Sequence, residues 1–489
     1  MFMDERRSNV WDQIRQQGLR SFEKLLSMAV FAEAAQEANL QLGTGPLRLP
    51  NLAWLAIASV LHASASFATV LTWTLRWLMD SEGWNGSELA RERRNGLRRG
   101  DYHSADRSKH DPRGTDPTVV SEEAFAQARQ RVSLAFWLSL LMVLTRRFQT
   151  QHDRWLRWND FRLVAIDGTQ IDLPNWKALG DHYGRAKNGS KEFHPQARMV
   201  MLQFPLARIP WRYELSPLRE GERTIAGRLL KGLEKNDLVL MDQGFWSYGL
   251  FWQIQEQEAY FAVRLFPNVK LKTRKKLGPN DRLVDWSPSD RKWKRAGLPD
   301  SIRLRVINYQ IPGFRPAAVV TNVLDPKRIS REQWVHMATA DEEGRLRLAQ
   351  GLYHRRWEIE TSFSELKVVQ GLESTLRSRT PKGIEYEISA HVLFYLLLRW
   401  LMVEAAEKEG IDPLRISFKH AYEVLQEMAP LLTISSLHHV RRVLYPRLLQ
   451  RIASHCVAFR PGRHDPRPKD TKPKNLGHGK IRQPHKLAN

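Results

Sequence analysis

Four polar residues in the last third of the chain recur at helical spacing and could act together on a phosphate group. Tyr353, Arg356, Glu360 and Lys367 stand at positions i, i+3, i+7 and i+14. At 3.6 residues per turn they fall within an arc of about 60° on one helix face. A carboxylate flanked by phosphate-binding side chains suits metal-assisted phosphoryl transfer on a nucleic acid. The alternative is an amphipathic helix whose charged edge is merely solvated.

Two further acids follow short apolar runs that predict β-strands. Asp167 ends the run FRLVAID, and Asp242 ends the run DLVLMD. Open α/β sheets bind ligands at the carboxyl ends of their strands, so we expect both carboxylates there, with Glu360 facing them. Three acids suffice for two Mg²⁺ ions, because Mg²⁺ keeps water and substrate oxygens as its other ligands. Each Asp alone is weak support, since Asp-Gly-Thr and Asp-x-Gly are also ordinary turn sequences.

An α/β sheet and one amphipathic helix must position these residues. Between Phe161 and Phe266, strand-like and helix-like runs alternate, which is typical of a mixed sheet flanked by helices. The segment around Glu360 carries an apolar stripe beside its polar face, formed by Leu348, Leu352, Ile359, Phe363 and Leu366. We therefore expect a single helix that packs on the core and presents its polar strip to the two Asp residues. Glu358 and Glu365 fall on the opposite side of this helix from Glu360, and we expect them to be non-catalytic.

Taken together, the three motifs resemble those of bacterial DDE transposases of the insertion-sequence-four family. They are Asp167-Gly168-Thr169, Asp242-Gln243-Gly244-Phe245 and Tyr353-x2-Arg356-x3-Glu360-x6-Lys367, and the likeness covers about residues 155 to 405. The resemblance implies an α/β RNase H-like catalytic core, a mixed sheet flanked by helices, with a largely β insertion and all-α regions at both ends. It also implies cut-and-paste transposition, in which one strand is cut, its 3′-hydroxyl forms a hairpin with the opposite strand, and the reopened end joins target DNA.

The resemblance further assigns roles to single residues. Three acids would hold two Mg²⁺ ions, for which we expect Mn²⁺ to substitute: Asp167, Asp242 and Glu360. Three others would grip the DNA backbone near the cut: Tyr353, Arg356 and Lys367. An aromatic residue of the insertion would stack on a flipped base beside the hairpin. Trp293 and Trp286 are the candidates, and no motif decides between them.

Changes in composition divide the chain into five parts. Residues 1–155 are predicted to be a helical DNA-binding region, although helices packed with a solvated face explain the same residues. The catalytic domain is expected at 156–266 and 341–405, interrupted by a β-rich insertion at 267–340. Residues 406–460 form a helical region that could pair two protomers. Residues 461–489 are rich in proline and basic residues without apolar periodicity, which predicts a disordered tail.

The charge balance favours a polyanionic partner. The 489 residues include 76 Lys and Arg against 53 Asp and Glu, a net charge of +23. Because aromatic residues are interspersed with the basic ones, nucleic acid is favoured over a membrane surface. The resemblance implies double-stranded DNA as that partner, as inverted-repeat ends and target DNA, bound by a homodimer in a synaptic complex. The single cysteine fits a reducing cytosol, and the resemblance implies a bacterial, nucleoid-associated protein.

Three alternatives remain open at this point. An RNase H-like nuclease would cut DNA without strand transfer, and a transposase-derived DNA-binding protein would keep the fold without catalysis. A membrane protein is the third, because no charge occurs from Pro50 to Leu75. Seven hydroxyl or imidazole side chains interrupt that run, and the N-terminus has no apolar run typical of a signal peptide. Buried helices are therefore expected at both this run and the apolar run from Ile388 to Val403.

Overall fold

The computed structural model describes most of the chain outside its two ends. The described residues are 21–63, 65–66, 69–71, 74–75, 120–188, 191–266, 269, 271–287, 293, 296–310, 316–335, 337–340, 346–349, 351–435 and 437–457. The predicted basic tail at 461–489 and much of the predicted N-terminal region lie outside these residues.

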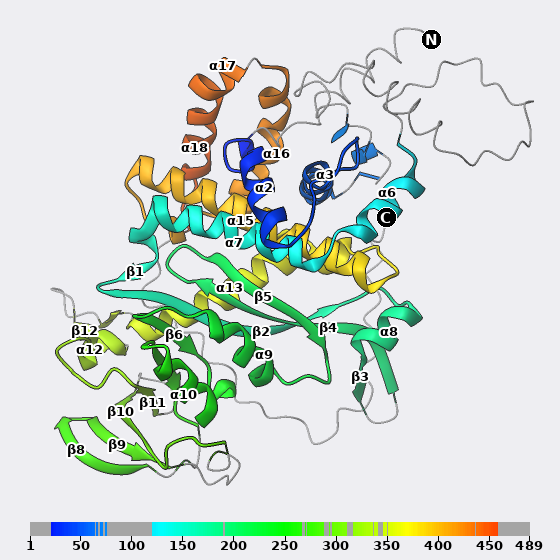
Figure 1. The fold of residues 1–489 in the computed structure, drawn as a ribbon. Helices are drawn as coiled ribbons and strands as arrows, with labels where there is room; N and C mark the ends of the chain where they lie inside the picture. Colours follow the sequence, from blue (N-terminus) through cyan, green and yellow to red (C-terminus); the bar gives the residue numbers. More distant parts are fainter. Residues whose placement is uncertain are drawn as a thin grey trace, which may run out of the picture.

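A mixed sheet lies at the centre of the molecule (Figure 1). Its catalytic part consists of β2 (Phe161–Asp172), β4 (Lys191–Phe204), β5 (Ile209–Pro217), β6 (Asp237–Met241) and β7 (Tyr260–Arg264). The spatial order is β5-β4-β2-β6-β7. Strands β5, β4 and β2 pair antiparallel, whereas β2, β6 and β7 run parallel. This is the predicted RNase H-like arrangement.

Helices cover both faces of this sheet. α7 (Leu134–His152), α13 (Glu358–Ser364) and α15 (Pro381–Glu409) lie on one face, and α9 (Glu222–Leu229) and α10 (Tyr248–Glu256) lie on the other (Figure 1). All five residues of β6 and the first six of β2 are consequently buried, as expected for strands with two covered faces. Because both faces of β2 and β6 are covered, apolar side chains follow one another along these strands rather than alternating with polar ones.

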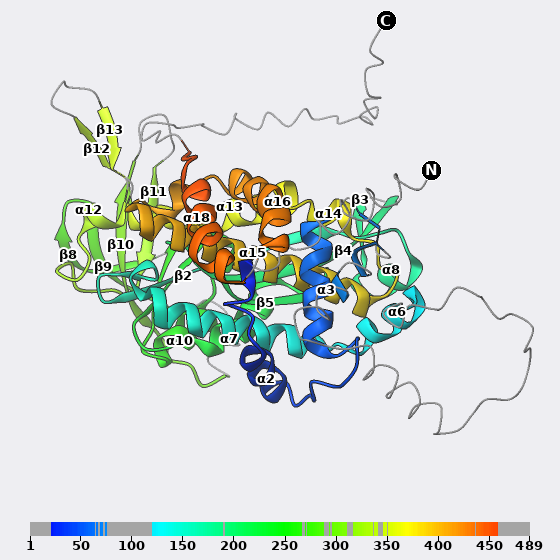
Figure 2. The ribbon, with the colours of Figure 1, turned by 90° about the horizontal axis from the view of Figure 1, so that it is seen from above.

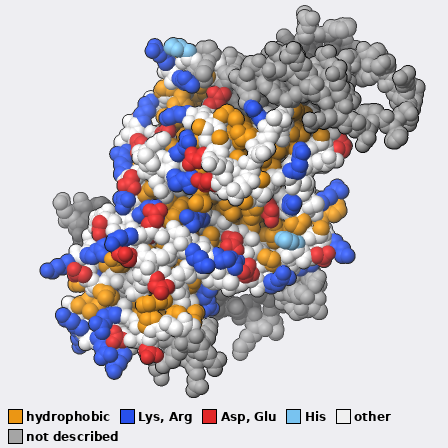
Figure 3. All heavy atoms as spheres, in the orientation of Figure 1, with side chains coloured by type: hydrophobic (Ala, Val, Ile, Leu, Met, Phe, Trp, Pro, Cys, Tyr) orange, Lys and Arg blue, Asp and Glu red, His pale blue; other side chains and the backbone are white. Residues whose placement is uncertain are grey.

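The insertion is largely β, as predicted, and it extends the catalytic sheet. Its strands are β8 (Lys272–Gly278), β9 (Asp281–Trp286), β10 (Ile302–Tyr309) and β11 (Ala317–Thr321). β11 pairs antiparallel with β7, so the described strands of both parts form one sheet of eleven. The edge strand β8 is exposed and basic, and Lys and Arg side chains gather at this end of the molecule (Figure 3). Charged side chains also protect such an edge from pairing with other chains.

Helices from both ends of the chain form one bundle around α15 (Figure 2). The N-terminal ones are α2 (Met28–Glu37), α3 (Leu49–Leu61) and α6 (Glu122–Arg131), and the C-terminal ones are α16 (Phe418–Ile434), α17 (Leu437–His439) and α18 (Tyr445–Ala453). The hydroxyl of Tyr386 in α15 donates to the Leu52 carbonyl at 2.7 Å, and that of Tyr422 in α16 donates to the Val60 carbonyl at 3.0 Å. The two terminal regions therefore pack on each other.

In the part of the chain that the structure describes, α15 is the helix whose length and composition would allow it to cross a membrane, but 94% of its most apolar window is buried inside the protein. Its polar residues have protein partners there: Arg399 pairs with Glu365, and His391 Nε2 lies 2.9 Å from Thr375 Oγ1. α3 is likewise buried along most of its length. The second apolar run and the part of the first that lies in α3 are core helices, as predicted; residues 64, 67–68 and 72–73 of the first run lie outside the described residues.

The remaining elements are short. They are η2 (Asp153–Trp155), β1 (Arg157–Trp158), α8 (Lys177–Tyr183), β3 (Arg185–Asn188), η3 (Leu230–Gly232), η4 (Gln243–Phe245), α12 (Arg331–Trp334), β12 (Met337–Ala340), β13 (Leu346–Ala349), η5 (Leu352–Trp357), η6 (Glu365–Val369), α14 (Leu372–Thr375), η7 (Pro413–Arg415) and η8 (Val440–Leu444).

Candidate active site

The parallel register of β2 and β6 brings two carboxylates side by side. Ala165 is paired with Leu240, and Asp167 and Asp242 each lie two residues further along. They therefore stand level and on the same face, on backbones about 4.8 Å apart. Asp167 Oδ1 accepts the Gly168 N–H at 2.8 Å, and Asp242 Oδ1 accepts the Gly244 N–H at 2.7 Å. Both side chains are thus oriented by the turn or strand that carries them.

The position of Asp167 differs from the prediction that it ends its strand. β2 continues to Asp172, and Asp167 is paired with Met201 of β4. The strand continues because β4 is fourteen residues long and supplies hydrogen-bond partners on the other side. Asp167 nevertheless stands where the neighbouring parallel strand β6 has just ended, so one side of it is open.

The segment that carries Glu360 is not the single α-helix expected from its spacing. It begins as the 3₁₀ helix η5, continues as α13, and ends as the π-helix η6. Leu348, predicted as part of the same helix, belongs to strand β13. In a 3₁₀ helix residues i and i+3 eclipse each other, so Tyr353 and Arg356 share one side of η5. The tight turn starts at Gly351, where a Cβ would lie 2.4 Å from the Val335 backbone.

Arg356 is the residue that connects the acids. Its Nη2 donates to Glu360 Oε1 at 2.7 Å, and its Nη1 lies 3.7 Å from Asp167 Oδ2. The guanidinium is buried, whereas 44% of the Glu360 side chain is exposed. Arg356 therefore acts as the counter-charge of the acids in this structure, and its predicted contact with the DNA backbone stays a prediction.

The electrostatics of Asp167 indicate a site that would accept a cation. Burial is the main cause that raises the pKa of Asp167 to about 7; the charges of Asp242 and Glu360 add to the rise, and the Gly168 hydrogen bond and the charge of Arg356 oppose it. The carboxylates of Asp167, Asp242 and Glu360 are hard oxygen ligands of the kind that Mg²⁺ prefers. Among the described residues no three His, Cys, Asp or Glu side chains are gathered into a ready-made metal cluster, and Arg356 reaches two of the acids. The donor set fits divalent ions by its chemistry.

Tyr353 and Lys367 are held by backbone carbonyls on either side of the acids. The Tyr353 hydroxyl donates to the carbonyl of Met241 at 2.8 Å, the residue just before Asp242. Lys367 Nζ donates to the carbonyl of Gln170 in β2 and lies 2.9 Å from Glu373 Oε1. Both side chains therefore attach the segment Leu352–Val369, named here the catalytic segment, to the strands that carry the Asp residues. Their predicted DNA contacts are not tested by this geometry.

The aromatic candidates of the insertion are packed against the protein. Trp286 is buried, with ring centroids of Trp246 and Tyr248 at 5.0 and 5.3 Å. Trp293 is half-buried and lies over Gly249, where a Cβ would come within 2.4 Å of its indole. Sequence reasoning missed Trp357, which is 52% exposed one turn before Glu360 and meets His354 at 4.5 Å. Its position just after Arg356 was the available signal.

The opposite side of the catalytic segment carries a buried ionic network. Arg208, in the turn between β4 and β5, donates to Glu358 Oε2 and to Glu365 Oε1, each at 2.8 Å. Glu365 also accepts from Tyr395 at 2.6 Å and pairs with Arg399 of α15. Glu358 and Glu365 therefore point away from Glu360, as predicted from helical spacing. Arg208 has φ of +53°, and no sequence motif marked it.

Comparison with known protein families gives one match to the catalytic part of the chain. Residues 158–397 match the family described as the transposase DDE domain. The match begins at the strand before Asp167 and ends within α15, so it contains all three acids and the insertion between them.

Two similar proteins extend this comparison. The transposase InsG for insertion sequence element IS4 of Escherichia coli (strain K12) is 27% identical over 344 residues, which cover 68% of this chain and 72% of that protein. A solved structure of a piggyBac transposase synaptic complex with hairpin DNA aligns with 92% of this chain and 87% of its own. Its TM-score is 0.37 at 10% sequence identity.

Proposed function

Because this chain belongs to the DDE transposases of the insertion-sequence-four family, we propose that it cuts the terminal inverted repeats of its own element and joins the ends to target DNA. A water oxygen attacks the scissile phosphorus and the bond to the 3′-oxygen breaks, which leaves a 3′-hydroxyl. That hydroxyl then attacks a phosphorus of the opposite strand, which forms a hairpin and releases the 3′-hydroxyl of the flanking DNA. A second water attacks the hairpin phosphorus and frees the 3′-hydroxyl again. This hydroxyl attacks a phosphorus of target DNA, and a 3′-hydroxyl of the target leaves.

The observation that carries the proposal is the register of the two strands. The register of β2 and β6, extended by two residues, places Asp167 level with Asp242 just after the end of β6, and Arg356 connects Asp167 to Glu360 on the facing helix. Such a set of acids from three separate elements is expected for two-metal phosphoryl transfer.

The family implies a divalent metal, and we propose that Asp167, Asp242 and Glu360 hold two Mg²⁺ ions, with Mn²⁺ as a substitute. Bound there, the ions would activate the attacking oxygen and stabilise the leaving one. The protein contributes the fixed positions of the ligands. Tyr353 holds the end of β6 just before Asp242, and Arg356 offsets part of the negative charge of the acids.

We further propose that Arg356 and Lys367 contact backbone phosphates and that an aromatic side chain supports a base displaced at the cut. Exposure favours Trp357 over Trp293 for this last role, because an indole that stacks on a base needs a free face. Joining two ends requires two active sites, so a homodimer on the bacterial nucleoid is the proposed working form.

The test is a cleavage and joining assay with the purified protein, Mg²⁺ and DNA that carries the inverted repeats flanking its own coding region. Glu360→Gln removes the charge of a proposed ligand without changing its shape. Glu423→Gln is the matched control, because Glu423 lies in α16 in an exposed pair with Lys419. We expect hairpins and joined products from wild type and from the control, and bound but uncut DNA from Glu360→Gln.

The other outcomes identify the alternatives. Cleavage without joining of a 3′-hydroxyl would indicate a nuclease of the same fold. Binding of the ends by all three proteins without any cleavage would indicate a DNA-binding protein that has lost catalysis.

A further inference from the structure

An open polar groove of about 480 Å³ begins beside the candidate active site. It is lined by Gly168, which follows Asp167, and by side chains that include Gln170, Asp172, Glu222, Lys367 and Glu373. Among the described residues that line the groove, Lys367 is the basic one, and three are acidic. A DNA strand that enters here meets mostly negative charge, so the availability of Lys367 determines whether a phosphate can be held.

Lys367 is already engaged by the protein. Its Nζ lies 2.9 Å from Glu373 Oε1 and donates to the Gln170 carbonyl. The same Glu373 oxygen accepts the backbone N–H of Asp172 at 3.2 Å. Glu373 thus takes one of the three N–H donors of the ammonium group, and the Gln170 carbonyl takes a second.

The pair is of a kind that phosphate can replace. The two side chains are 24% and 30% exposed, and ion pairs open to solvent contribute little to stability. A phosphate oxygen offers Lys367 the same charge-assisted hydrogen bond that the carboxylate gives. We therefore propose that Glu373 competes with the DNA backbone for Lys367 and must release it when the strand is bound. This inference rests on the proposed function, in which Lys367 is a phosphate ligand.

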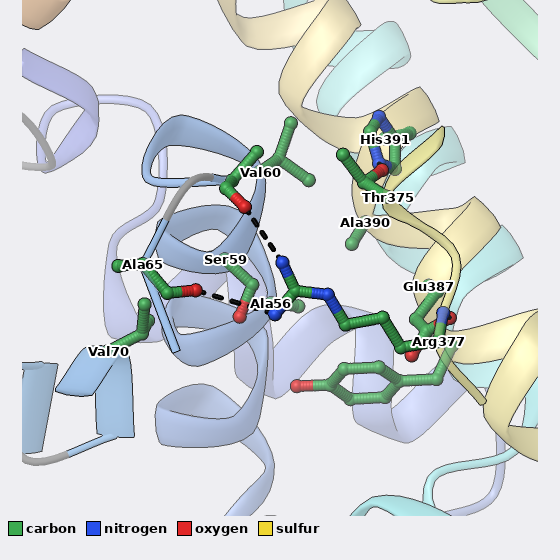
Figure 4. A pocket seen from close by; sticks show the side chains of 12 residues that line it. Ala56, Ser59, Val60, Ala65, Val70, Thr375, Arg377, Glu387, Ala390 and His391 are labelled. Atoms are coloured by element: carbon green, nitrogen blue, oxygen red, sulfur yellow. Dashed lines mark hydrogen bonds between the residues drawn. The ribbon is translucent and has the colours of Figure 1, made fainter. Parts of the chain in front are cut away.

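The segment that carries Glu373 is fixed at both of its ends. Gly371 begins it with φ of +67°, and its carbonyl accepts from the hydroxyls of Ser374 and Thr375 at 2.8 and 3.0 Å. At the other end, Arg377 donates to the carbonyls of Ala63 and Ala65 just after α3, at 2.9 and 3.4 Å (Figure 4). The backbone of α14 therefore stays in place, and release requires only that the Glu373 side chain rotate.

The same contacts connect the segment that carries Glu373 to the N-terminal helices. Thr375 lies 2.9 Å from His391 of α15, and Arg377 points at the loop that leaves α3 (Figure 4). The backbone that carries Glu373 is thus held in a fixed position relative to both Lys367 and the helices around α15. Without DNA its carboxylate returns to the same ammonium group.

A double-mutant cycle tests the competition. The probe is a duplex oligonucleotide with the element's inverted repeat, and its affinity is measured without divalent metal. Glu373→Gln should bind about fivefold more tightly than wild type, since it removes a charge competitor but keeps the shape. Asp172→Asn removes a charge from the same groove without a contact to Lys367, and it should change affinity less than about twofold. Thermal unfolding checks that each variant is folded.

Replacing Lys367 separates this inference from the proposed function. In a Lys367→Met background, Glu373→Gln should lose its advantage and match Asp172→Asn. The competition is overturned if Glu373→Gln gains the same affinity with Lys367 present as with Met in its place. It is also overturned if Glu373→Gln and Asp172→Asn change the affinity equally. If Lys367→Met alone leaves both affinity and its salt dependence unchanged, the assignment of Lys367 as a phosphate ligand fails first; loss of one phosphate contact should reduce the salt slope by about 0.9.

Discussion

The two sides of the catalytic segment, from Leu352 to Val369, carry the same residue types in opposite situations. On the front, which faces β2 and β6, Glu360 pairs with Arg356 and is 44% exposed. On the back, Glu358 and Glu365 pair with Arg208 and are 14% and 10% exposed. Both sides are built from glutamate and arginine, so residue type does not distinguish Glu360, the proposed metal ligand, from the acids of the back.

Charge balance and hydrogen bonding separate the two sides. On the back, two carboxylates meet the two guanidinium groups of Arg208 and Arg399, and Tyr395 adds a hydrogen bond. On the front, Arg356 pairs with two carboxylates, those of Asp167 and Glu360, and the charge of Asp242 acts on Asp167 as well. Burial would raise the pKa of Glu365, but Arg399 and Arg208 outweigh it and hold that pKa below its ordinary value. The pKa of Asp167 instead rises to about 7. The carboxylates of the back are balanced by guanidinium groups, whereas those of the front, the proposed metal ligands, have less positive charge beside them.

The largest expected effect comes from removing a front acid. Glu360→Gln should reduce the rate of end cleavage by at least about 10³-fold, as losses of residues central to catalysis do, because it removes a proposed metal ligand. Glu360 is exposed, so the midpoint of thermal unfolding should stay within a few degrees of wild type. Single-turnover cleavage and calorimetry measure the two effects. A variant that cuts at the wild-type rate would remove Glu360 from the site.

A substitution on the back should mainly lower stability, whereas one on the front should mainly lower activity. Arg208→Gln leaves Glu358 and Glu365 without their shared partner and should lower the free energy of unfolding by about 3 kcal/mol, the cost of breaking a buried ion pair. Arg157→Gln is the control, because its pair with Asp153 is exposed on both sides and should cost less than about 1 kcal/mol. Urea unfolding measures the free energy lost in each variant. Equal losses in Arg208→Gln and Arg157→Gln would contradict the structural role of the back.

pH should distinguish the two sides as well. The raised pKa means that Asp167 in the metal-free protein carries a proton below about pH 7, and this proton must leave before the carboxylate can bind a cation. At a fixed, limiting Mg²⁺ concentration, cleavage should therefore fall up to about tenfold per unit of pH below 7. More Mg²⁺ should move the midpoint to lower pH. A midpoint that is independent of Mg²⁺ concentration would argue against Asp167 as a ligand.

On the back, the pKa of the buried acid Glu365 is shifted in the opposite direction from that of Asp167. Because the pKa of Glu365 is lowered in the folded protein, its contribution to stability is present above the ordinary value of 4.5 and is lost as the pH falls below that value. Unfolding by urea at pH 7 and at pH 5 should thus give similar contributions from Arg208, measured as the difference between wild type and Arg208→Gln. A contribution that disappears by pH 6 would contradict this assignment.

The smallest expected effect concerns the aromatic side chains. Trp357→Ala should slow hairpin formation by about tenfold, the scale of one lost base stack, without a change in unfolding midpoint, since the indole is exposed. Trp293→Ala should instead lower the unfolding midpoint, because its indole packs over Gly249. Hairpin yield and thermal unfolding of both variants measure the difference. If Trp293→Ala alone blocked hairpins, the original assignment to the insertion would be correct.

The sequence predicted the parts of this protein that depend on local pattern. Apolar runs gave the strands before Asp167 and Asp242, and the spacing from Tyr353 to Lys367 gave the polar side that faces them. Helical periodicity also placed Glu358 and Glu365 on the other side from Glu360. These features depend on residues close in sequence, whose geometry is set by the 2-residue and 3.6-residue periods of strands and helices.

Tertiary structure alone decided the features that depend on residues distant in sequence. Pairing with β4 carries β2 past Asp167, and pairing of β11 with β7 makes the insertion an extension of the sheet. Arg208 lies about 150 residues before its partners, and the Gln170 carbonyl that accepts from Lys367 lies 197 residues before it. The sequence names the groups that can ionise. Their burial and their partners, which fix pKa and availability, arise only when distant elements pack together.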